Sequence, residues 1–262
     1  MWQLVKSLDH MHKKGIFHRD IKPENILIES NAEMGRGLKL ADFGSCRGIY
    51  SKQPYTEYIS TRWYRAPECL LTDGYYGPEM DLWGAGCVMF EITSLYPLFP
   101  GSNEVDQVSR IHKVLGTPSQ ELLSRFKAKG STHMSLDFPE QKGIGIPNLI
   151  PHASADCIDL IVKMLRYDAT ERITSREALR HPYFREVREA EAKRSDLDAL
   201  KGSADMGSPS KPAQSQGAQD KMLPSLTSSG VGAAGQGMKG NAQVHFKPCN
   251  IVYLVRFLDG SE

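Results

Sequence analysis

Two short polar segments near the start of the chain carry side chains of the kind that transfer a phosphoryl group. The first is HRDIKPEN at residues 18–25, and the second is DFG at residues 42–44. Phosphoryl transfer needs a carboxylate to orient the attacking hydroxyl, oxygen ligands for Mg²⁺, and a cation that balances the developing charge. The two segments offer all of these groups, on Asp20, Lys22, Asn25 and Asp42.

Each of these residue types predicts a separate role. Asp20 can accept or orient the hydroxyl proton, and Lys22 can reach the transferred phosphate. Asn25 offers a neutral carbonyl oxygen and Asp42 a carboxylate, which are ligands that a hard cation prefers. Gly44 permits the backbone turn that presents Asp42.

The elements around these segments predict how they meet. Apolar residues between Met1 and Met11 recur at helical spacing, and Gly15 can close that helix. Residues 26–28 and 38–41 are typical of two short strands around a glycine-bearing turn. Because these strands join the two polar segments, both segments could lie at one end of a hairpin.

The apolar patterns in the remainder of residues 1–185 predict further helices, so we expect the fold to be mainly α. Residues 81–95 are apolar nearly all round, which indicates a buried helix. Residues 156–167 have one apolar face, which predicts a second, amphipathic helix. A third helix should follow, with Ser175 as its N-terminal cap and His181-Pro182 as its stop.

The composition of the 262 residues is that of a soluble globular protein, with 40% hydrophobic and 24% charged residues. A net charge of +1 gives no reason to expect nucleic acid or a membrane surface as a partner. The five cysteines are scattered, which favours reduced thiols in the cytosol or the nucleus. No apolar run approaches the roughly 20 residues that span a bilayer.

A change of character at Glu186 predicts a division into residues 1–185 and 186–262. A charged, helix-favouring stretch comes first, and residues 202–242 are then rich in Gly, Ser, Ala, Gln and Pro. Such a segment buries too little apolar surface to offset its ordering entropy, so we expect the tail to be largely disordered. Residues 243–260 are apolar again but too short to fold alone.

Four motifs in order resemble the signature of the eukaryotic protein kinases: HRDIKPEN, DFG, STRWYRAPE at residues 60–68, and DLWGAG at residues 81–86. One such motif alone is usually a turn or a surface loop, whereas four in register are specific. The resemblance covers residues 1–185 and implies the C-terminal lobe of a kinase, a helical bundle with short β-hairpins around the catalytic loop. It also implies ATP and Mg²⁺ as cofactors and protein substrates. WYRAPE is typical of the branch with the mitogen-activated, cyclin-dependent and MAK-like kinases.

Thr56-Glu57-Tyr58 resembles the doubly phosphorylated TEY motif of the mitogen-activated protein kinases. The resemblance implies phosphorylation by an upstream kinase or by autophosphorylation. The added charges would need arginines, with Arg19 and Arg47 as candidates for Thr56, and Arg62 and Arg65 for Tyr58. The alternative is a solvated Thr-Glu-Tyr on a mobile loop.

The resemblance implies roles for other residues that would contact nucleotide or substrate. Leu27 would lie under the adenine ring, and Thr61 would bond with Asp20 and Lys22 and favour Ser/Thr substrates. Arg65 would fix the backbone beside the residue after the phosphoacceptor, which implies a preference for proline there.

Structural roles are implied for a second group. Glu68 would pair with Arg172, Asp81 would bind the backbone of the catalytic loop, and His18 and Phe43 would belong to a packed column. Residues 116–154 resemble the insert of this kinase branch, which binds partners there.

The small lobe of a kinase cannot be found in the sequence. Only residues 1–17 precede HRD, and they lack the glycine-rich loop, the strand lysine and its glutamate partner. We therefore expect a truncated form with little activity alone, whose face normally covered by the small lobe is open to a partner. The alternative is a non-catalytic binding module or decoy scaffold.

Overall fold

The computed structural model describes residues 1–31, 35–55, 62–130 and 135–204. Within these ranges, residues 1–191 belong to one compact unit and residues 192–204 to a second. Thr56, Tyr58 and Thr61, and the predicted disordered tail beyond residue 204 with its apolar patch, lie outside the described residues.

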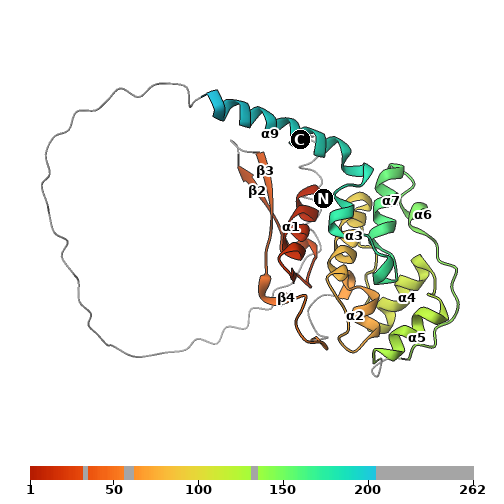
Figure 1. The fold of residues 1–262 in the computed structure, drawn as a ribbon. Coiled ribbons are helices and arrows are strands. Elements are labelled where there is room, and N and C mark those ends of the chain that lie inside the picture. Colours follow the sequence, from red (N-terminus) through yellow and green to blue (C-terminus); the bar gives the residue numbers. More distant parts are fainter. Residues whose placement is uncertain (32–34, 56–61, 131–134, 205–262) are drawn as a thin grey trace, which may run out of the picture. The chain divides into compact units, whose positions relative to one another are not determined.

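Helix α1, Trp2–Lys13, buries the apolar face that the sequence predicts, with Leu4, Val5 and Leu8 inside. The chain leaves the helix at Gly15, whose φ of +74° lies in the left-handed region that favours glycine. The helix contacts β1, β3 and α8, so it supports the hairpin that follows (Figure 1).

Two antiparallel strand pairs surround the catalytic loop. Strand β1, Ile16–Phe17, pairs with β4, Arg47–Gly48. Strand β2, Ile26–Asn31, pairs with β3, Gly35–Leu40, with Ile26 opposite Leu40. The predicted hairpin is confirmed, and it brings residue 26, just after HRDIKPEN, opposite residue 40, just before DFG.

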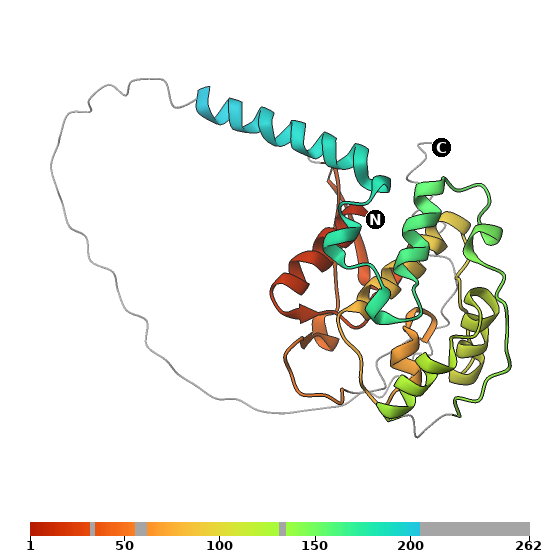
Figure 2. The same cartoon turned by 45° about the vertical axis from the view of Figure 1, so that its right-hand side comes forward.

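The buried helix predicted at residues 81–95 is α3, Glu79–Ser94, and it runs through the centre of the core. Its Trp83 stacks on Phe99 with ring centroids 5.7 Å apart. Helix α7, Ala155–Met164, packs along α3, as both views of the molecule show (Figures 1 and 2). The predicted helix at 156–167 is therefore confirmed but ends earlier, at Met164.

The remaining helices of this unit build the sides of the core. They are α2, Pro67–Leu71; α4, Glu104–Leu115; α5, Gln120–Ala128; α6, Ile146–Leu149; and α8, Ser175–Ala178. Short 3₁₀-helices lie at Pro23–Asn25, Phe43–Ser45, Arg62–Tyr64, Ala169–Glu171 and Pro182–Phe184. Helices α5 and α6 belong to the predicted insert, residues 116–154.

One prediction about the end of this unit is wrong. The cap of α8 is Thr174, which forms a reciprocal capping box with Glu177, and Ser175 is instead the buried first residue of the helix. Helix α9, Arg185–Ala204, extends three residues into the segment 202–242 that the composition predicts to be disordered, and the rest of that segment lies outside the described residues. The charged stretch from Glu186 favours helix strongly enough to carry the helix past Gly202. Among the described helices, none is long and apolar enough to cross a membrane.

Candidate active site

The backbone of the catalytic loop is held by one buried carboxylate. Asp81, from the first turn of α3, accepts hydrogen bonds from the backbone N–H of His18 and of Arg19, each 2.8 Å long. The ring of His12 lies 2.9 Å from the same carboxylate. Arg19 has φ of +72°, an unfavourable conformation for a residue with a side chain, and the two bonds to Asp81 fix it there. This is the contact that the resemblance implies for Asp81.

Asp20, Lys22 and Asn25 form one hydrogen-bonded cluster. The ammonium of Lys22 lies 2.8 Å from Asp20 Oδ2. Asn25 Nδ2 donates to the backbone oxygen of Asp20 at 2.8 Å and to its Oδ2 at 2.9 Å. Asp20 and Asn25 are buried, so the carboxylate is held in one orientation between a cation and an amide.

The DFG segment is fastened beside this cluster. The N–H of Ala41 donates to the backbone oxygen of Asn25 at 2.9 Å, which places Asp42 one residue from that contact. The His18 ring binds the Ala41 oxygen at 3.0 Å and lies 5.5 Å from the Phe43 ring. Asp42 itself has φ of +61° and an exposed side chain. The structure thus brings both predicted loops, and the predicted His18–Phe43 contact, to one place.

The side chains here suit an Mg²⁺ ion that is bound by the protein and by the nucleotide together. Because Asn25 donates through Nδ2 to Asp20, its Oδ1 is left as the oxygen that can bind a cation. Within the described ranges, no group of three or more His, Cys, Asp or Glu forms a metal cage. Mg²⁺ is commonly bound by one or two protein oxygens together with phosphates and water, and Asn25 with Asp42 fits that pattern.

The four predicted phosphate-binding arginines fall into different environments. Arg19 is buried, and its guanidinium donates to the Ser45 oxygen and, at 2.9 Å, to the Tyr76 hydroxyl. Arg47 is exposed in β4. Arg62 and Arg65 both approach Glu104 in the first turn of α4, at 3.7 and 3.8 Å. Burial lowers the pKa of the Arg65 guanidinium.

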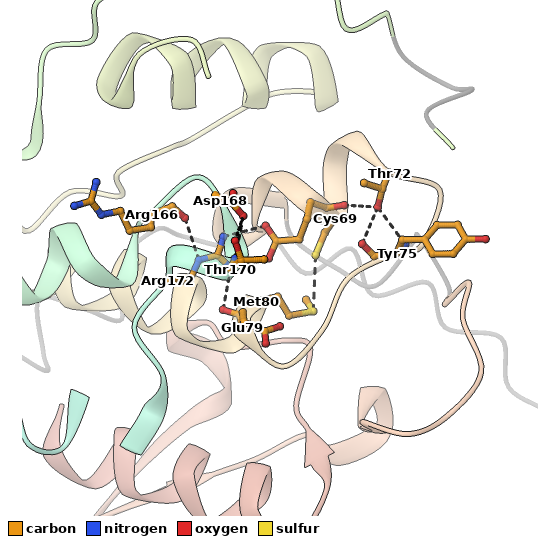
Figure 3. Close-up of polar contacts among 10 residues, drawn as sticks. Cys69, Thr72, Tyr75, Glu79, Met80, Arg166, Asp168, Thr170 and Arg172 are labelled. Carbon is orange, nitrogen blue, oxygen red and sulfur yellow. Dashed lines mark hydrogen bonds and ion pairs between the residues drawn. The ribbon is translucent and has the colours of Figure 1, made fainter. Parts of the chain in front are cut away.

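Glu68 and Arg172 form the ion pair that the resemblance implies, although 104 residues separate them. The pair is bidentate, with bonds of 2.6 and 3.0 Å, and both side chains are buried. Arg172 also donates to the backbone oxygens of Arg166, at 3.1 Å, and Glu79, at 2.9 Å (Figure 3). One guanidinium therefore ties α2, the start of α3 and the segment before α8 together.

Leu27 and Phe43 present apolar surface near the loop. Leu27 in β2 is 53% exposed and Phe43 is 56% exposed. The exposure of Leu27 leaves its side chain accessible to a ligand. Gly44 is also exposed, directly after Phe43.

Sequence reasoning missed Glu91, a buried carboxylate near the end of α3. It accepts a hydrogen bond of 2.7 Å from the Tyr64 hydroxyl, which links the WYRAPE segment to α3. Burial raises the pKa of Glu91, and the nearby Glu24 carboxylate adds to the rise. The available signal was the one acidic residue in the apolar run that follows Asp81, residues 82–95.

Comparison with known proteins decides the family. The sequence profile described as "Protein kinase domain" matches residues 1–184. This chain belongs to the protein kinase family. It is 62% identical over 191 residues to the human "MAPK/MAK/MRK overlapping kinase", which covers 73% of this chain and 44% of that protein.

More distant kinase relatives match the same part of the chain. Human "Serine/threonine-protein kinase MAK" is 45% identical over 185 residues, covering 70% of this chain and 29% of that protein. Mouse "Serine/threonine-protein kinase ICK" is 44% identical over 185 residues, covering 70% of this chain and 28% of that protein. The chain thus spans less than half the length of these curated relatives. These matches support the MAK-like branch that WYRAPE indicates.

Proposed function

We propose that the chain carries the phosphoryl-transfer loops of a serine/threonine protein kinase, which uses MgATP to phosphorylate proteins. The observation that carries the proposal is the buried Asp20–Lys22–Asn25 cluster with the Asp42 loop fastened to its end. The similarity to named serine/threonine kinases supports the same reaction.

Each side chain has one task in this proposal. Asp20 orients the substrate hydroxyl and accepts its proton. Lys22 places its positive charge beside the transferred phosphate. Asn25 Oδ1 and the Asp42 carboxylate would hold Mg²⁺, which neutralises charge on the phosphates when bound. Leu27 would contact the adenine ring. The contact of 2.8 Å between Lys22 and Asp20 keeps both groups beside the site of transfer.

The finer features of specificity and regulation are part of the proposal. Arg65 favours proline after the phosphoacceptor, and Thr61 favours serine and threonine over tyrosine. Phosphorylation of Thr56 and Tyr58, by an upstream kinase or by the chain itself, switches the enzyme through Arg19, Arg47, Arg62 and Arg65. We also propose a cytoplasmic or nuclear location and low activity of this chain alone.

A binding module is the second candidate function. Leu27, Ile28 and Phe43 are large apolar side chains that are all exposed beside the catalytic loop. Surface of this kind is what a protein partner covers. In this alternative the loops hold their geometry but transfer nothing.

Radiolabelled phosphate transfer from MgATP to a Ser-Pro peptide separates the two candidates. A kinase predicts measurable transfer that falls by about 100-fold or more in Asp20→Asn and in Asp42→Asn. The control is Asp137→Asn, which removes an exposed carboxylate far along the sequence and should leave transfer unchanged. Transfer that survives both active-site changes contradicts the proposal, and no transfer by the unchanged chain favours the binding module.

A further inference from the structure

Strand β2 leaves backbone hydrogen-bonding groups open along its outer edge, at Ile28. Strand β3 lies beside α1 (Figure 1), where the N–H of Leu38 donates to Gln3 Oε1 at 2.5 Å. Because that N–H points away from β2, Leu38 and its partner Ile28 form a non-hydrogen-bonded pair, and the N–H and C=O of Ile28 point to the outer side of β2. Among the described residues, neither group has a hydrogen-bond partner. This edge is therefore open to a further strand.

Both faces of β2 carry apolar side chains that are partly uncovered. Successive side chains of a strand point to opposite faces, so Leu27 and Ile28 lie on different faces of the hairpin. Leu27 is 53% exposed and Ile28 is 41% exposed. On the face of Leu27, the Glu29 carboxylate pairs with Lys39 of β3 at 2.6 Å. A third strand at this edge would therefore meet apolar side chains on both faces and a carboxylate on one of them.

One segment of the chain has the pattern of such a strand and has been given no role above. Residues 251–258, IVYLVRFL, are rich in β-branched and aromatic residues and contain neither glycine nor proline. Both alternating sets of side chains are apolar except at Arg256, which is typical of a strand covered on both faces. Asn250 precedes the run and Asp259-Gly260 follows it, and these residue types commonly end strands. The run lies outside the described residues, and its sequence predicts a strand that needs a partner.

The residues before this run allow it to reach the hairpin of the same chain. Residues 205–249, rich in Gly, Ser and Ala, separate it from the end of α9. A flexible chain of about 45 residues has a root-mean-square length of roughly 35–40 Å, and it can extend much further. Such a tether gives a segment an effective concentration of about 1 mM at a target in its own chain. Pairing within one chain is therefore favoured over pairing with a second copy in a micromolar solution.

We propose that residues 251–258 of this chain add to the outer edge of β2 as a third, antiparallel strand. An antiparallel strand continues the pairing that joins β2 and β3. It would give the N–H and C=O of Ile28 hydrogen-bond partners, and it would remove an edge that could otherwise pair with another molecule. The pairing does not depend on phosphoryl transfer.

The single charge within the segment sets the register. When Arg256 lies beside Glu29, that carboxylate has a basic side chain on each side, with Lys39 in β3 as the other. Phe257 is then opposite Ile28. A slip by one residue would move every side chain of the segment to the other face and take Arg256 away from Glu29. Charge and apolar pattern therefore favour the same alignment.

Proline substitutions within the segment test the pairing on the full chain, because proline removes one backbone donor. In the proposed register the N–H of Val255 points toward β2, whereas that of Leu254 points away from it. Hydrogen exchange followed by mass spectrometry should show the Ile28 amide protected in the unchanged protein. Val255→Pro should speed its exchange at least about tenfold, and Leu254→Pro, the matched control, should keep most of the protection. Equal exchange in the three proteins, or equal loss of protection in the two variants, overturns the proposal.

A cross-linking experiment checks the register and separates pairing within the chain from pairing between copies. Leu27 and Leu258 lie on one face in the proposed pairing, so Leu27→Cys with Leu258→Cys should form a disulfide under mild oxidation. Leu27→Cys with Phe257→Cys, whose side chains would point to opposite faces, is the matched control and should react at least about tenfold more slowly. Both pairs carry Cys249→Ser, since Cys249 lies close to the segment in sequence. A disulfide-linked dimer in place of the internal bond, or equal rates for the two pairs, overturns the proposal.

Discussion

Single residues in this chain fix the geometry of the catalytic loop through buried polar contacts. Asp81 illustrates this, because its two oxygens bind two consecutive backbone N–H groups in a loop where one residue has positive φ. Arg172 holds a second junction through four hydrogen bonds that involve Glu68, Glu79 and Arg166. Losing one partner of such a buried contact costs stability, because the other partner is left unsatisfied. Substitution of Asp81 or Arg172 should therefore disturb the structure that each residue holds without removing a reacting group.

His112 predicts a pH dependence of stability. The side chain is 1% exposed, and burial lowers its pKa from 6.5 to about 4. Between these values the unfolded chain binds a proton that the folded chain does not, so the free energy of unfolding falls as pH falls. The loss from this residue begins as pH drops through 6.5, is complete near pH 4, and is at most about 3 kcal/mol.

Urea unfolding across this pH range measures the effect. His112 binds the Tyr167 hydroxyl at 2.8 Å, so the variant that removes the titrating group is the double substitution His112→Phe with Tyr167→Phe. Its unfolding free energy should depend less steeply on pH than that of the unchanged protein. Tyr167→Phe alone keeps the imidazole and should keep the slope. An identical slope in all three proteins would mean that His112 is not the source.

At the scale of elements, two glycines in α3 allow it to pack closely against its neighbours. A Cβ at Gly84 would lie 2.9 Å from both the Cβ and the backbone oxygen of Ile21, in the catalytic loop. A Cβ at Gly86 would lie 2.9 Å from the Cβ of Met164 in α7. Only the first contact lies next to Asp20 and Lys22.

We predict that Gly84→Ala lowers both stability and phosphoryl transfer. Alanine ordinarily gains about 1 kcal/mol over glycine within a helix, but overpacking here costs about 1–3 kcal/mol. The net change should be destabilising by about 1 kcal/mol, and the pushed loop should misplace Asp20. Gly86→Ala is the matched control: it should lower the unfolding free energy to a similar degree while the transfer rate per folded molecule stays unchanged. Equal activity loss in the two variants contradicts this account.

The elements that sequence predicted well are those whose pattern is local. Helix α1 follows from the spacing of Leu4, Val5 and Leu8, and α3 follows from an apolar run long enough to be a buried helix. The hairpin of β2 and β3 follows from two short apolar runs around a turn. Thr174 was missed as a cap because Ser175, its neighbour, has the same hydrogen-bonding ability.

The candidate site could be predicted where motif residues are close in sequence, and less well where distant segments meet. HRDIKPEN contains Asp20, Lys22 and Asn25, so their cluster needed no long-range information. The contact between Glu91 and Tyr64 joins two helical segments and has no local signature. The shared approach of Arg62 and Arg65 to Glu104 likewise depends on how α4 packs.

At the scale of the whole compact unit, residues 1–191, its first helix and the start of its last helix hold each other. The Trp2 ring lies 5.4 Å from that of Phe184 and donates from Nε1 to Glu191 Oε2 at 3.2 Å. Lys6 pairs with the other oxygen of Glu191 at 2.5 Å. This contact joins residues 189 positions apart, so it closes the unit on itself. It also anchors the first residues of α9 against the helix that leads into the catalytic loop.

The apolar and the charged parts of this contact should contribute differently. Trp2→Ala removes a partly buried ring and should lower the unfolding free energy by about 2 kcal/mol. Glu191→Ala should cost less than about 1 kcal/mol, because the pair with Lys6 is about half exposed. Hydrogen exchange at residues 185–191 should nevertheless speed up in Glu191→Ala, since the end of the helix loses its anchor. Glu189→Ala, an exposed change in the same helix, is the matched control. Equal exchange in the two glutamate variants would show that α9 is held by the ring contact alone.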